Sequence, residues 1–505
     1  MLNRRMSGVL LHPTSLPGPH GIGELGPEAF KFADWLAAAG QTVWQMLPIG
    51  PPGYGESPYQ LFSAFAGNPM LISLDTVVKR GWLRAGDIAA PGFAQDSVEF
   101  ERVMPWKTEL LREAFAGFRA SAEEVDLVEF EEFSAANSAW LESYAAFMAL
   151  KQAHGGAPWT EWSSGAQAAP GEIEYQKFLQ WEFAREWAAL REYCGIRRVR
   201  LMGDAPIYVA HDSADVWAHP DLFQLDSNGR PTVVAGVPPD YFSATGQLWG
   251  NPIYRWNRLA DTGYRWWVDR MRAAVREFDI IRLDHFRGFE AYWEVPAGEK
   301  TAEKGRWAKG PGAELLDVLR RELRNLPFVA ENLGVITPEV EAIRNQFGLP
   351  GMAILQFAFG DDPQAPTFRP HNYVRNLAAY TGTHDNDTVV GWWNGEGGAS
   401  TRTAAQVSAE KERARAYLNN EGREINWTFI GTLMSSVANL VVFPAQDLLG
   451  LGSESRMNIP AVPSGNWRWR MAPRALTPEM AGRLKEMSRL YERGGPAKED
   501  AAAAS

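Results

Sequence analysis

Short apolar runs recur along the chain, and each ends in a polar or Gly- and Pro-rich cluster. Runs of this length and apolar content are typical of strands that are buried on both faces. Amphipathic helical stretches lie between them: one opens at Pro27 and stops at Gly40, and another has Thr337 as N-cap, Pro338 as its first residue and Gly348 at its end. The eight runs are GVLLHPTS (8–15), TVWQMLPIG (42–50), VRLMGDAPI (199–207), DIIRLDHF (279–286), PFVAENLG (327–334), MAILQFAFG (352–360), LAAYTGTHDND (377–387) and NLVVFPAQD (439–447).

Strand, loop and helix therefore alternate eight times, which predicts an α/β protein with one closed (β/α)8 TIM barrel over residues 1–505. The spacing is uneven, and this predicts two insertions. Residues 70–195 should form a largely helical insertion between strands 2 and 3. Residues 208–262 should form a second insertion, with a substrate loop too rich in Pro and Gly for a regular element. Residues 496–505 are expected to be a frayed tail.

The composition excludes several classes of partner. The net charge of -11 is spread along the chain without a basic block, which argues against nucleic acid and against a membrane surface. Cys194 is the only cysteine, so an intrachain disulfide is impossible and a reducing compartment is favoured. The N-terminal apolar stretch is too short for a signal peptide and no run has the length of a membrane span, so we expect a cytoplasmic protein.

The 21 Trp residues are unusual because several lie in loop-like contexts such as GQLWGNP and SGNWRWR. A large aromatic core would account for many of them. A flat ring on a loop, however, is suited to stacking on a base or on the apolar face of a sugar. The acidic charge balance favours the sugar.

Acidic residues close four of the predicted strands. Asp284, Glu331 and Asp385 each follow an apolar run, and Asp204 closes the third. Active sites of TIM barrels lie at the carboxyl ends of the strands, so these are the candidate catalytic groups. Any one of them alone could be a helix cap or an ion-pair partner, but several in one barrel favour chemistry.

The surroundings of the acids predict different tasks. Side chains alternate along a strand, so Arg282 and Asp284 should project to the same side, where the guanidinium would keep Asp284 ionised as a nucleophile. The apolar residues before Glu331 should raise its pKa, as a general acid requires. Retaining glycosidases use such a pair, with the carboxyl groups roughly 5 to 5.5 Å apart. Asp385 could bind sugar hydroxyls and stabilise the transition state, and His285 should face the opposite side in a structural role.

Other chemistries lack their motifs. The eight His residues show no HExxH or paired metal spacing, and no GxxxxGK[ST] or GxSxG motif is present. The Gly-rich segment GPHGIGELG at 18–26 lacks the strand–turn–helix context and glycine spacing of a dinucleotide loop. We therefore expect no catalytic metal and no cofactor.

Several motifs together resemble the 4-alpha-glucanotransferases (amylomaltases, or disproportionating enzymes) of glycoside hydrolase family 77 in the alpha-amylase clan. The resemblance is carried by LLHPTSLPG, GPPGYGESPYQ, GDAPIYVAHDSADVW, VPPDYFSATGQLWGNPIY, RLDHFRG, AENLG, GMAILQFAF, THDND and MNIPAVPSGNWRWR. It implies a barrel with inserted, largely helical subdomains and no separate C-terminal β-domain.

The resemblance also implies roles for individual residues. Asp284 would be the nucleophile, Glu331 the acid/base and Asp385 the transition-state stabiliser. Tyr59 would stack on the transferred sugar. The further substrate contacts that it implies are Asp204, Arg282, His384, Asp240, Tyr241, Phe242, Gln247, Trp249, Asn458 and Asn466, with Tyr54 at a secondary glucan site.

The implied reaction is transfer of alpha-1,4-glucan segments to the 4-hydroxyl of another glucan or of glucose, with disproportionation or cyclisation as the outcome. We expect maltooligosaccharides, amylose, starch or glycogen as partners, no nucleic acid or membrane, and a monomer. Two alternatives stay open at this point: an alpha-glucan hydrolase that uses the same three acids, and a barrel that only binds glucan.

Overall fold

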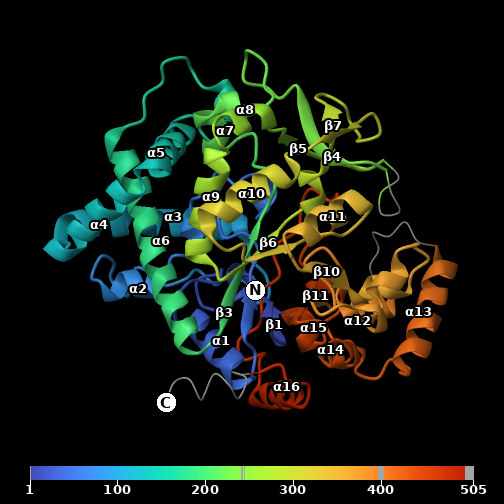
Figure 1. Ribbon diagram of the computed structural model, residues 1–505. Coiled ribbons are helices and arrows are strands. Elements are labelled where there is room, and N and C mark those ends of the chain that lie inside the picture. The colour runs from blue at the N-terminus through green and yellow to red at the C-terminus, as the bar shows by residue number, and fades with distance from the viewer. Residues whose placement is uncertain (1, 240–242, 244, 396–402, 495–505) are drawn as a thin grey trace.

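Eight parallel strands form a barrel at the centre of the molecule (Figure 1), in the order β10-β11-β12-β1-β2-β3-β6-β9. The computed structural model describes residues 2–239, 243, 245–395 and 403–494. The ring is completed between β9 and β10, where the Ala330 N–H donates to the Pro350 carbonyl at 2.8 Å and the Met352 N–H donates to Asn332 Oδ1 at 2.8 Å. The barrel predicted from the apolar runs is confirmed. Its strands are β1 (Met6–Leu10), β2 (Val43–Gln45), β3 (Arg200–Ala205), β6 (Ile280–Leu283), β9 (Phe328–Ala330), β10 (Gly351–Ile354), β11 (Leu377–Tyr380) and β12 (Leu440–Pro444).

The register of three neighbouring strands brings the acids together. Asp204 on β3 lies opposite Arg282 on β6, and Leu283 lies opposite Ala330 on β9. Asp284 and Glu331 directly follow those last two residues. Because parallel strands end at the same rim, their side chains emerge at one mouth of the barrel.

The helices begin and end near the signals in the sequence. The first begins at Pro27 and is followed by Gly40 in the left-handed conformation, with φ 68°. The helix after β9 begins at Pro338 as predicted, but the Thr337 hydroxyl does not cap its backbone. The helices outside the two insertions are α1 (Pro27–Ala38), α9 (Arg265–Glu277), α10 (Gly312–Leu323), α11 (Pro338–Gln346), α12 (Val389–Asn394), α13 (Ala404–Leu418), α14 (Ile425–Ser435), α15 (Ala445–Leu449) and α16 (Pro478–Leu490).

Helices fill the long segment between β2 and β3 and lie together on one side of the barrel, at the left of Figure 1. They share an aromatic core in which the rings of Trp82, Phe118 and Trp181 lie within 6 Å of one another. This packing explains part of the Trp content without any ligand. These helices are α2 (Leu74–Lys79), α3 (Phe100–Ser121), α4 (Glu124–Ala136), α5 (Ser138–Ala153) and α6 (Pro170–Ile196).

A second, antiparallel sheet has the order β5-β4-β7-β8 and lies above the barrel in Figure 1. Its strands are β4 (Val233–Val237), β5 (Gln247–Pro252), β7 (Ala291–Pro296) and β8 (Arg306–Lys309), with α7 (Ala214–Ala218) before β4 and α8 (Trp256–Asp261) after β5. The loop segment VPPDYFSATGQLWGNPIYRW, predicted to be too rich in Pro and Gly for a regular element, contains β5, so that prediction is wrong, and this insertion is not all helical. The sheet forms despite its Gly and Pro residues because β4 pairs on both sides and buries Ala235 completely.

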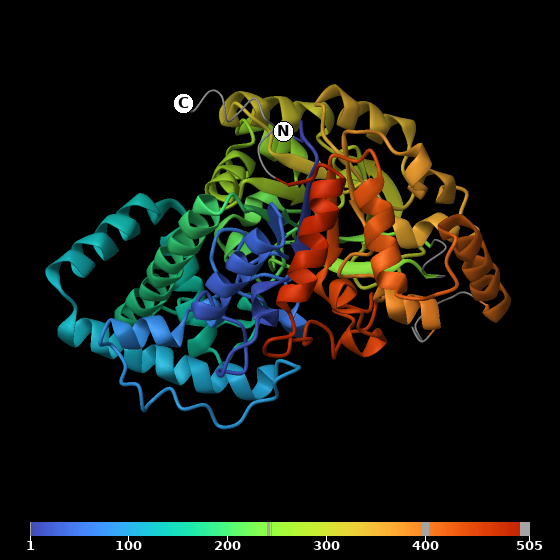
Figure 2. The same ribbon diagram turned by 90° about the horizontal axis from the view of Figure 1, so that it is seen from below.

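The two ends of the described chain meet at the barrel. β1 pairs in parallel with β12 over its whole length, from Met6 opposite Leu440 to Leu10 opposite Pro444. Arg493, which is fully buried, donates to the carbonyl oxygens of Met6 and Ala438. In the described residues after β12, up to 494, there are helices and no strand. Figure 2 shows α16 (red) beside the N-terminal elements (blue).

Candidate active site

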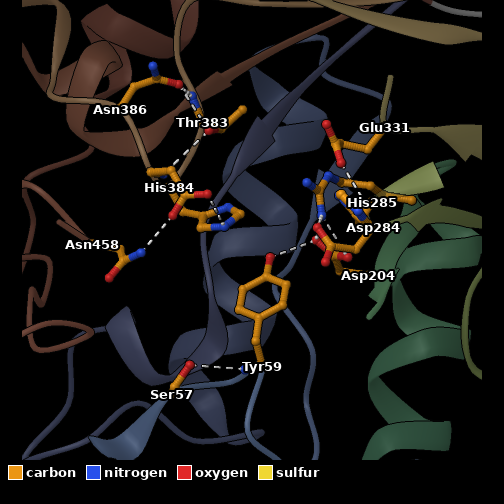
Figure 3. Close-up of polar contacts among 12 residues, drawn as sticks. Ser57, Tyr59, Asp204, Asp284, His285, Glu331, Thr383, His384, Asn386 and Asn458 are labelled. Carbon is orange, nitrogen blue, oxygen red and sulfur yellow. Dashed lines mark hydrogen bonds and ion pairs between the residues drawn. The ribbon is translucent and has the colours of Figure 1, made fainter. Parts of the chain in front are cut away.

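One guanidinium joins two acids at the barrel mouth. Arg282 is 5 % exposed, and its Nη1 lies 2.8 Å from Asp204 Oδ2 and 2.7 Å from Asp284 Oδ1. Arg282 and Asp284 thus face the same side, as their alternation along β6 predicts. Figure 3 shows Asp204, Asp284 and Glu331 gathered on one side of the mouth.

The Asp204 side chain has no exposed surface. Burial raises its pKa to about 6, although the charge of Arg282 opposes the rise. The Tyr59 hydroxyl donates to Asp204 Oδ2 at 2.9 Å. Burial and the neighbouring Asp204 hold the pKa of Tyr59 well above its ordinary value, so the phenol remains a hydrogen-bond donor.

Glu331 has the environment that a proton-transferring group requires. Its Oε2 accepts a hydrogen bond from the His285 N–H at 2.7 Å, and its Oε1 accepts one from the Leu333 N–H at 2.9 Å. Burial raises the pKa of Glu331 to about 7; the charge of Asp284 adds to the rise, while Arg282 and the two N–H groups oppose it. Glu331 can therefore both give and take a proton near neutral pH.

Asp385 lies across the mouth from this group. Its Oδ1 accepts a hydrogen bond from Asn458 Nδ2 at 2.6 Å, and its Oδ2 lies 3.3 Å from His384 Nε2. Removal from water would raise the pKa of Asp385, but His384 and the Asn458 hydrogen bond outweigh this and hold the pKa below its usual range. The side chain is 47 % exposed, so an ionised carboxylate faces the open mouth.

Aromatic rings line the floor between the two groups of acids. The Tyr59 ring stacks on His384 with centroids 5.1 Å apart and an interplanar angle of 21°. Trp467 packs against both, at 6.0 Å from Tyr59 and 5.9 Å from His384. Trp467 was not among the predicted contacts, although its loop context SGNWRWR had already suggested a stacking role.

Four other predicted substrate contacts, Gln247, Trp249, Tyr54 and Asn466, have no hydrogen bond to the acids among those described. Gln247 and Trp249 lie on β5, where Trp249 Nε1 donates to Gln247 Oε1 at 3.1 Å. Tyr54 is 78 % exposed. The Asn466 side chain forms hydrogen bonds with the backbone of its own loop: its Oδ1 accepts from the Ile459 N–H, and its Nδ2 donates to the Val462 carbonyl. The remaining predicted contacts, Asp240, Tyr241 and Phe242, lie outside the described residues.

His285, for which a structural role is predicted, lies next to Glu331. Its main-chain N–H contacts Glu331, and its ring packs edge-to-face on Trp249 with centroids 4.8 Å apart. Alternation along a strand could not predict this, because β6 ends at Leu283 and His285 has φ 48° and ψ 51°.

Comparison with known proteins identifies the family. A model of glycoside hydrolase family 77, described as 4-alpha-glucanotransferase, matches residues 11–477. The chain belongs to this family. It is 50 % identical to the 4-alpha-glucanotransferase of Thermus thermophilus over 97 % of this chain and 99 % of that protein. It is 48 % identical to the 4-alpha-glucanotransferase of a Synechocystis strain over 98 % of this chain and 99 % of that protein.

Solved structures agree with this assignment. An amylomaltase from Streptococcus agalactiae in complex with acarbose superposes with a TM-score of 0.91 at 37 % identity, covering 97 % of this chain and all of that one. An amylomaltase from Corynebacterium glutamicum, 19 % identical, shares the fold with a TM-score of 0.81 over 97 % of this chain and 76 % of that one. No helix in the described part of the chain is long and apolar enough to cross a bilayer.

Proposed function

We propose that this protein transfers alpha-1,4-glucan segments from one glucan to the 4-hydroxyl of another glucan or of glucose, by a retaining double displacement. The observation that carries the proposal is the contrast between two neighbouring carboxyl groups. Glu331 has a pKa raised to about 7, and Asp284 is in direct contact with the Arg282 guanidinium. Two carboxyl groups in such different environments suit an acid and a nucleophile.

In the first step, the Asp284 carboxylate attacks the anomeric carbon while protonated Glu331 gives its proton to the glycosidic oxygen. The bond to the leaving glucan breaks, and the remaining segment becomes an ester of Asp284. Arg282 holds the attacking carboxylate in place. Asp385, held by Asn458, supplies negative charge facing the oxocarbenium-like transition state.

In the second step, ionised Glu331 takes the proton of an acceptor 4-hydroxyl, and the acceptor oxygen displaces Asp284. The configuration at the anomeric carbon is retained because it inverts twice. The stacked rings of Tyr59 and His384 form a platform for the transferred sugar. The proposed contacts from the second insertion, including Gln247 and Trp249, would hold the glucan near the cleavage point. We further propose that the protein works in the cytoplasm as a monomer on starch- or glycogen-type glucans.

A hydrolase with the same acids would use water in the second step. Incubation with maltotriose separates the two reactions: transfer gives glucose and longer maltodextrins at constant total reducing ends, whereas hydrolysis raises the reducing ends. We expect the first result. A rise in reducing ends that matches maltotriose consumption would identify a hydrolase, and unchanged maltotriose would leave only glucan binding.

The roles of the two acids can be tested by trapping the intermediate. With an alpha-maltosyl fluoride donor, whose leaving group needs little protonation, Glu331→Gln should accumulate a maltosyl ester on Asp284 that mass spectrometry detects. Asp284→Asn should form no adduct and should lose transfer by several orders of magnitude. An adduct on another residue would overturn the assignment of the nucleophile.

A further inference from the structure

The residue after the proposed nucleophile has an unusual backbone conformation. His285 has φ 48° and ψ 51°, in the left-handed region that residues other than Gly adopt uncommonly, Asn, Asp and His more often than the rest. This conformation turns its N–H toward Glu331, whose Oε2 accepts the hydrogen bond at 2.7 Å. The peptide of His285 is therefore one of two main-chain donors that hold the carboxyl group of Glu331.

The same turn is tied to the backbone of Glu331. The Phe286 N–H donates to the Glu331 carbonyl at 3.1 Å, and the Glu331 N–H donates to the Leu283 carbonyl at 3.0 Å. A change in the conformation of His285 would therefore move the Glu331 carboxyl group relative to Asp284.

The main charged groups around Glu331 in the described part of the chain come from β6 and β3. Arg282 and Asp284 act on it from β6 and its end, and Asp204 on β3 is joined to both through Arg282. Burial lowers the pKa of the His285 ring to about 4, so this ring is neutral near pH 7. The His285 main-chain donor is thus a separate, uncharged influence on Glu331.

The His285 side chain is enclosed, which fixes the turn. It is 9 % exposed, and its ring meets Trp249 of β5 edge-to-face at 86°. The turn leaves no room for a larger residue at Gly288, where a Cβ would lie 3.1 Å from His285 Cδ2 and 2.7 Å from Ile207 Cδ1. The Trp249 ring in turn lies beside the buried Tyr208 ring, with ring centroids 6.4 Å apart.

We propose that His285 is a positioning residue for Glu331: its ring, packed against Trp249, holds its own peptide in the left-handed conformation that aims the N–H at the carboxyl group. This contact links β5, in the insertion that carries the proposed substrate contacts, to the proton-transferring group. The inference rests on the proposed role of Glu331 as acid/base. Packing between His285 and Trp249 then becomes a route by which β5 affects the chemistry.

Substitutions that differ in their tolerance of the left-handed conformation test the idea. His285→Asn and His285→Gly tolerate it and keep the N–H, whereas β-branched His285→Val does not. We expect His285→Val to lower kcat about 10²-fold through misplacement of Glu331. Loss of one hydrogen bond to the Glu331 carboxylate should also raise its pKa. The basic limb, which is the fall of kcat/KM at high pH, should therefore move upward by about one pH unit. His285→Asn and His285→Gly tolerate the conformation but lose the ring contact with Trp249, so they should move that limb in the same direction by less than His285→Val does.

The control variant is Arg324→Val. Arg324 is an exposed residue at the C-terminal end of α10 with φ 63°, so valine there imposes a similar backbone strain at a different place. Arg324→Val should lower the melting temperature without moving the basic limb of kcat/KM. A basic limb in His285→Val equal to that of the parent protein would overturn the proposal, as would a shift in His285→Asn as large as that in His285→Val.

The link to β5 has its own test in Trp249. Trp249→Ala should shift the basic limb in the same direction as His285→Val, while Trp249→Phe, which keeps an aromatic ring against His285, should shift it less. An unshifted limb in Trp249→Ala would remove β5 from the proposal. Failure of the parent protein to transfer glucan would reject the proposed function itself, whereas transfer with identical limbs in every variant would reject only the positioning role.

Discussion

The raised pKa of Glu331 makes a prediction about stability that is independent of turnover. Burial raises this pKa from an ordinary 4.5 to about 7 in the folded protein. The folded state therefore binds the proton more tightly than the unfolded state. Between about pH 4.5 and pH 7, Glu331 is ionised in the unfolded chain but still protonated in the folded protein. Its contribution therefore lowers the free energy of unfolding as the pH rises, and this destabilisation reaches its full size above about pH 7.

The size of the effect follows from the shift. A difference of about 2.5 pKa units at about 1.4 kcal/mol per unit is a penalty of about 3 kcal/mol at pH 8.5 that is nearly absent at pH 4.5. Glu331→Gln removes the ionisation. Glutamine has one acceptor oxygen for the two N–H groups of His285 and Leu333, which costs about 1–3 kcal/mol. That cost is roughly constant with pH, so the pH-dependent difference isolates the ionisation.

Thermal unfolding measures this difference. For a chain of 505 residues, the unfolding entropy is about 1 kcal/mol/K, so 3 kcal/mol corresponds to about 3 °C. The melting temperature of Glu331→Gln relative to the parent protein should rise by about 3 °C between pH 4.5 and pH 8.5. A difference that does not change with pH would refute the reasoning.

Glu277 provides a matched control at the end of α9. Burial raises its pKa to about 8, with Arg191 opposing the rise. Glu277→Gln should gain stability toward high pH in the same way and keep full glucan transfer, whereas Glu331→Gln should lose transfer. Equal activities in the two variants would contradict the role proposed for Glu331.

Four further predictions concern the mouth of the barrel. The kcat/KM of the parent protein should fall above about pH 7, because only protonated Glu331 can start the first step; a rate that stays level up to pH 9 would exclude Glu331 as that acid. Arg282→Lys keeps a charge but cannot contact both acids with the same geometry, and should lower kcat about 10²-fold. Arg282→Met leaves Asp204 and Asp284 without their cation and should cost about 3–5 kcal/mol of stability; a melting temperature equal to that of the parent would contradict this. Trp467→Ala removes a ring that supports Tyr59 and His384, and should raise KM about tenfold with a smaller effect on kcat; an unchanged KM would show that the ring only fills space.

The barrel and its acids could be predicted because they rest on simple periodicities. Strands buried on both faces read as continuous apolar runs, and the carboxyl ends of parallel strands share one rim. The same alternation placed Arg282 and Asp284 side by side, as their 2.7 Å contact shows. These features depend on local sequence and a known topology, not on details of packing.

The antiparallel sheet and the left-handed turn at His285 could not be predicted in this way. β5 contains Gly250 and Pro252, which weaken a strand by themselves, and it is formed because it pairs with β4, which β7, far along the chain, supports on its other side. The left-handed turn at His285 carries no glycine to announce it. Both depend on contacts between segments that a single sequence does not reveal.

The pairing of β1 with β12 also bears on how the protein is made. β1 pairs with β2 and with β12, and the second partner lies about 430 residues further along the chain. At about 5–20 residues per second, a ribosome completes that partner roughly 20 to 90 s after β1. During this time one edge of β1 is unpaired and open to wrong pairing. Arg493, which binds the carbonyl oxygens of Met6 and Ala438, is made later still. The nascent chain can therefore complete its barrel only after β12 and Arg493 have been made, and its yield in cells should depend on chaperones that shield β1 until then.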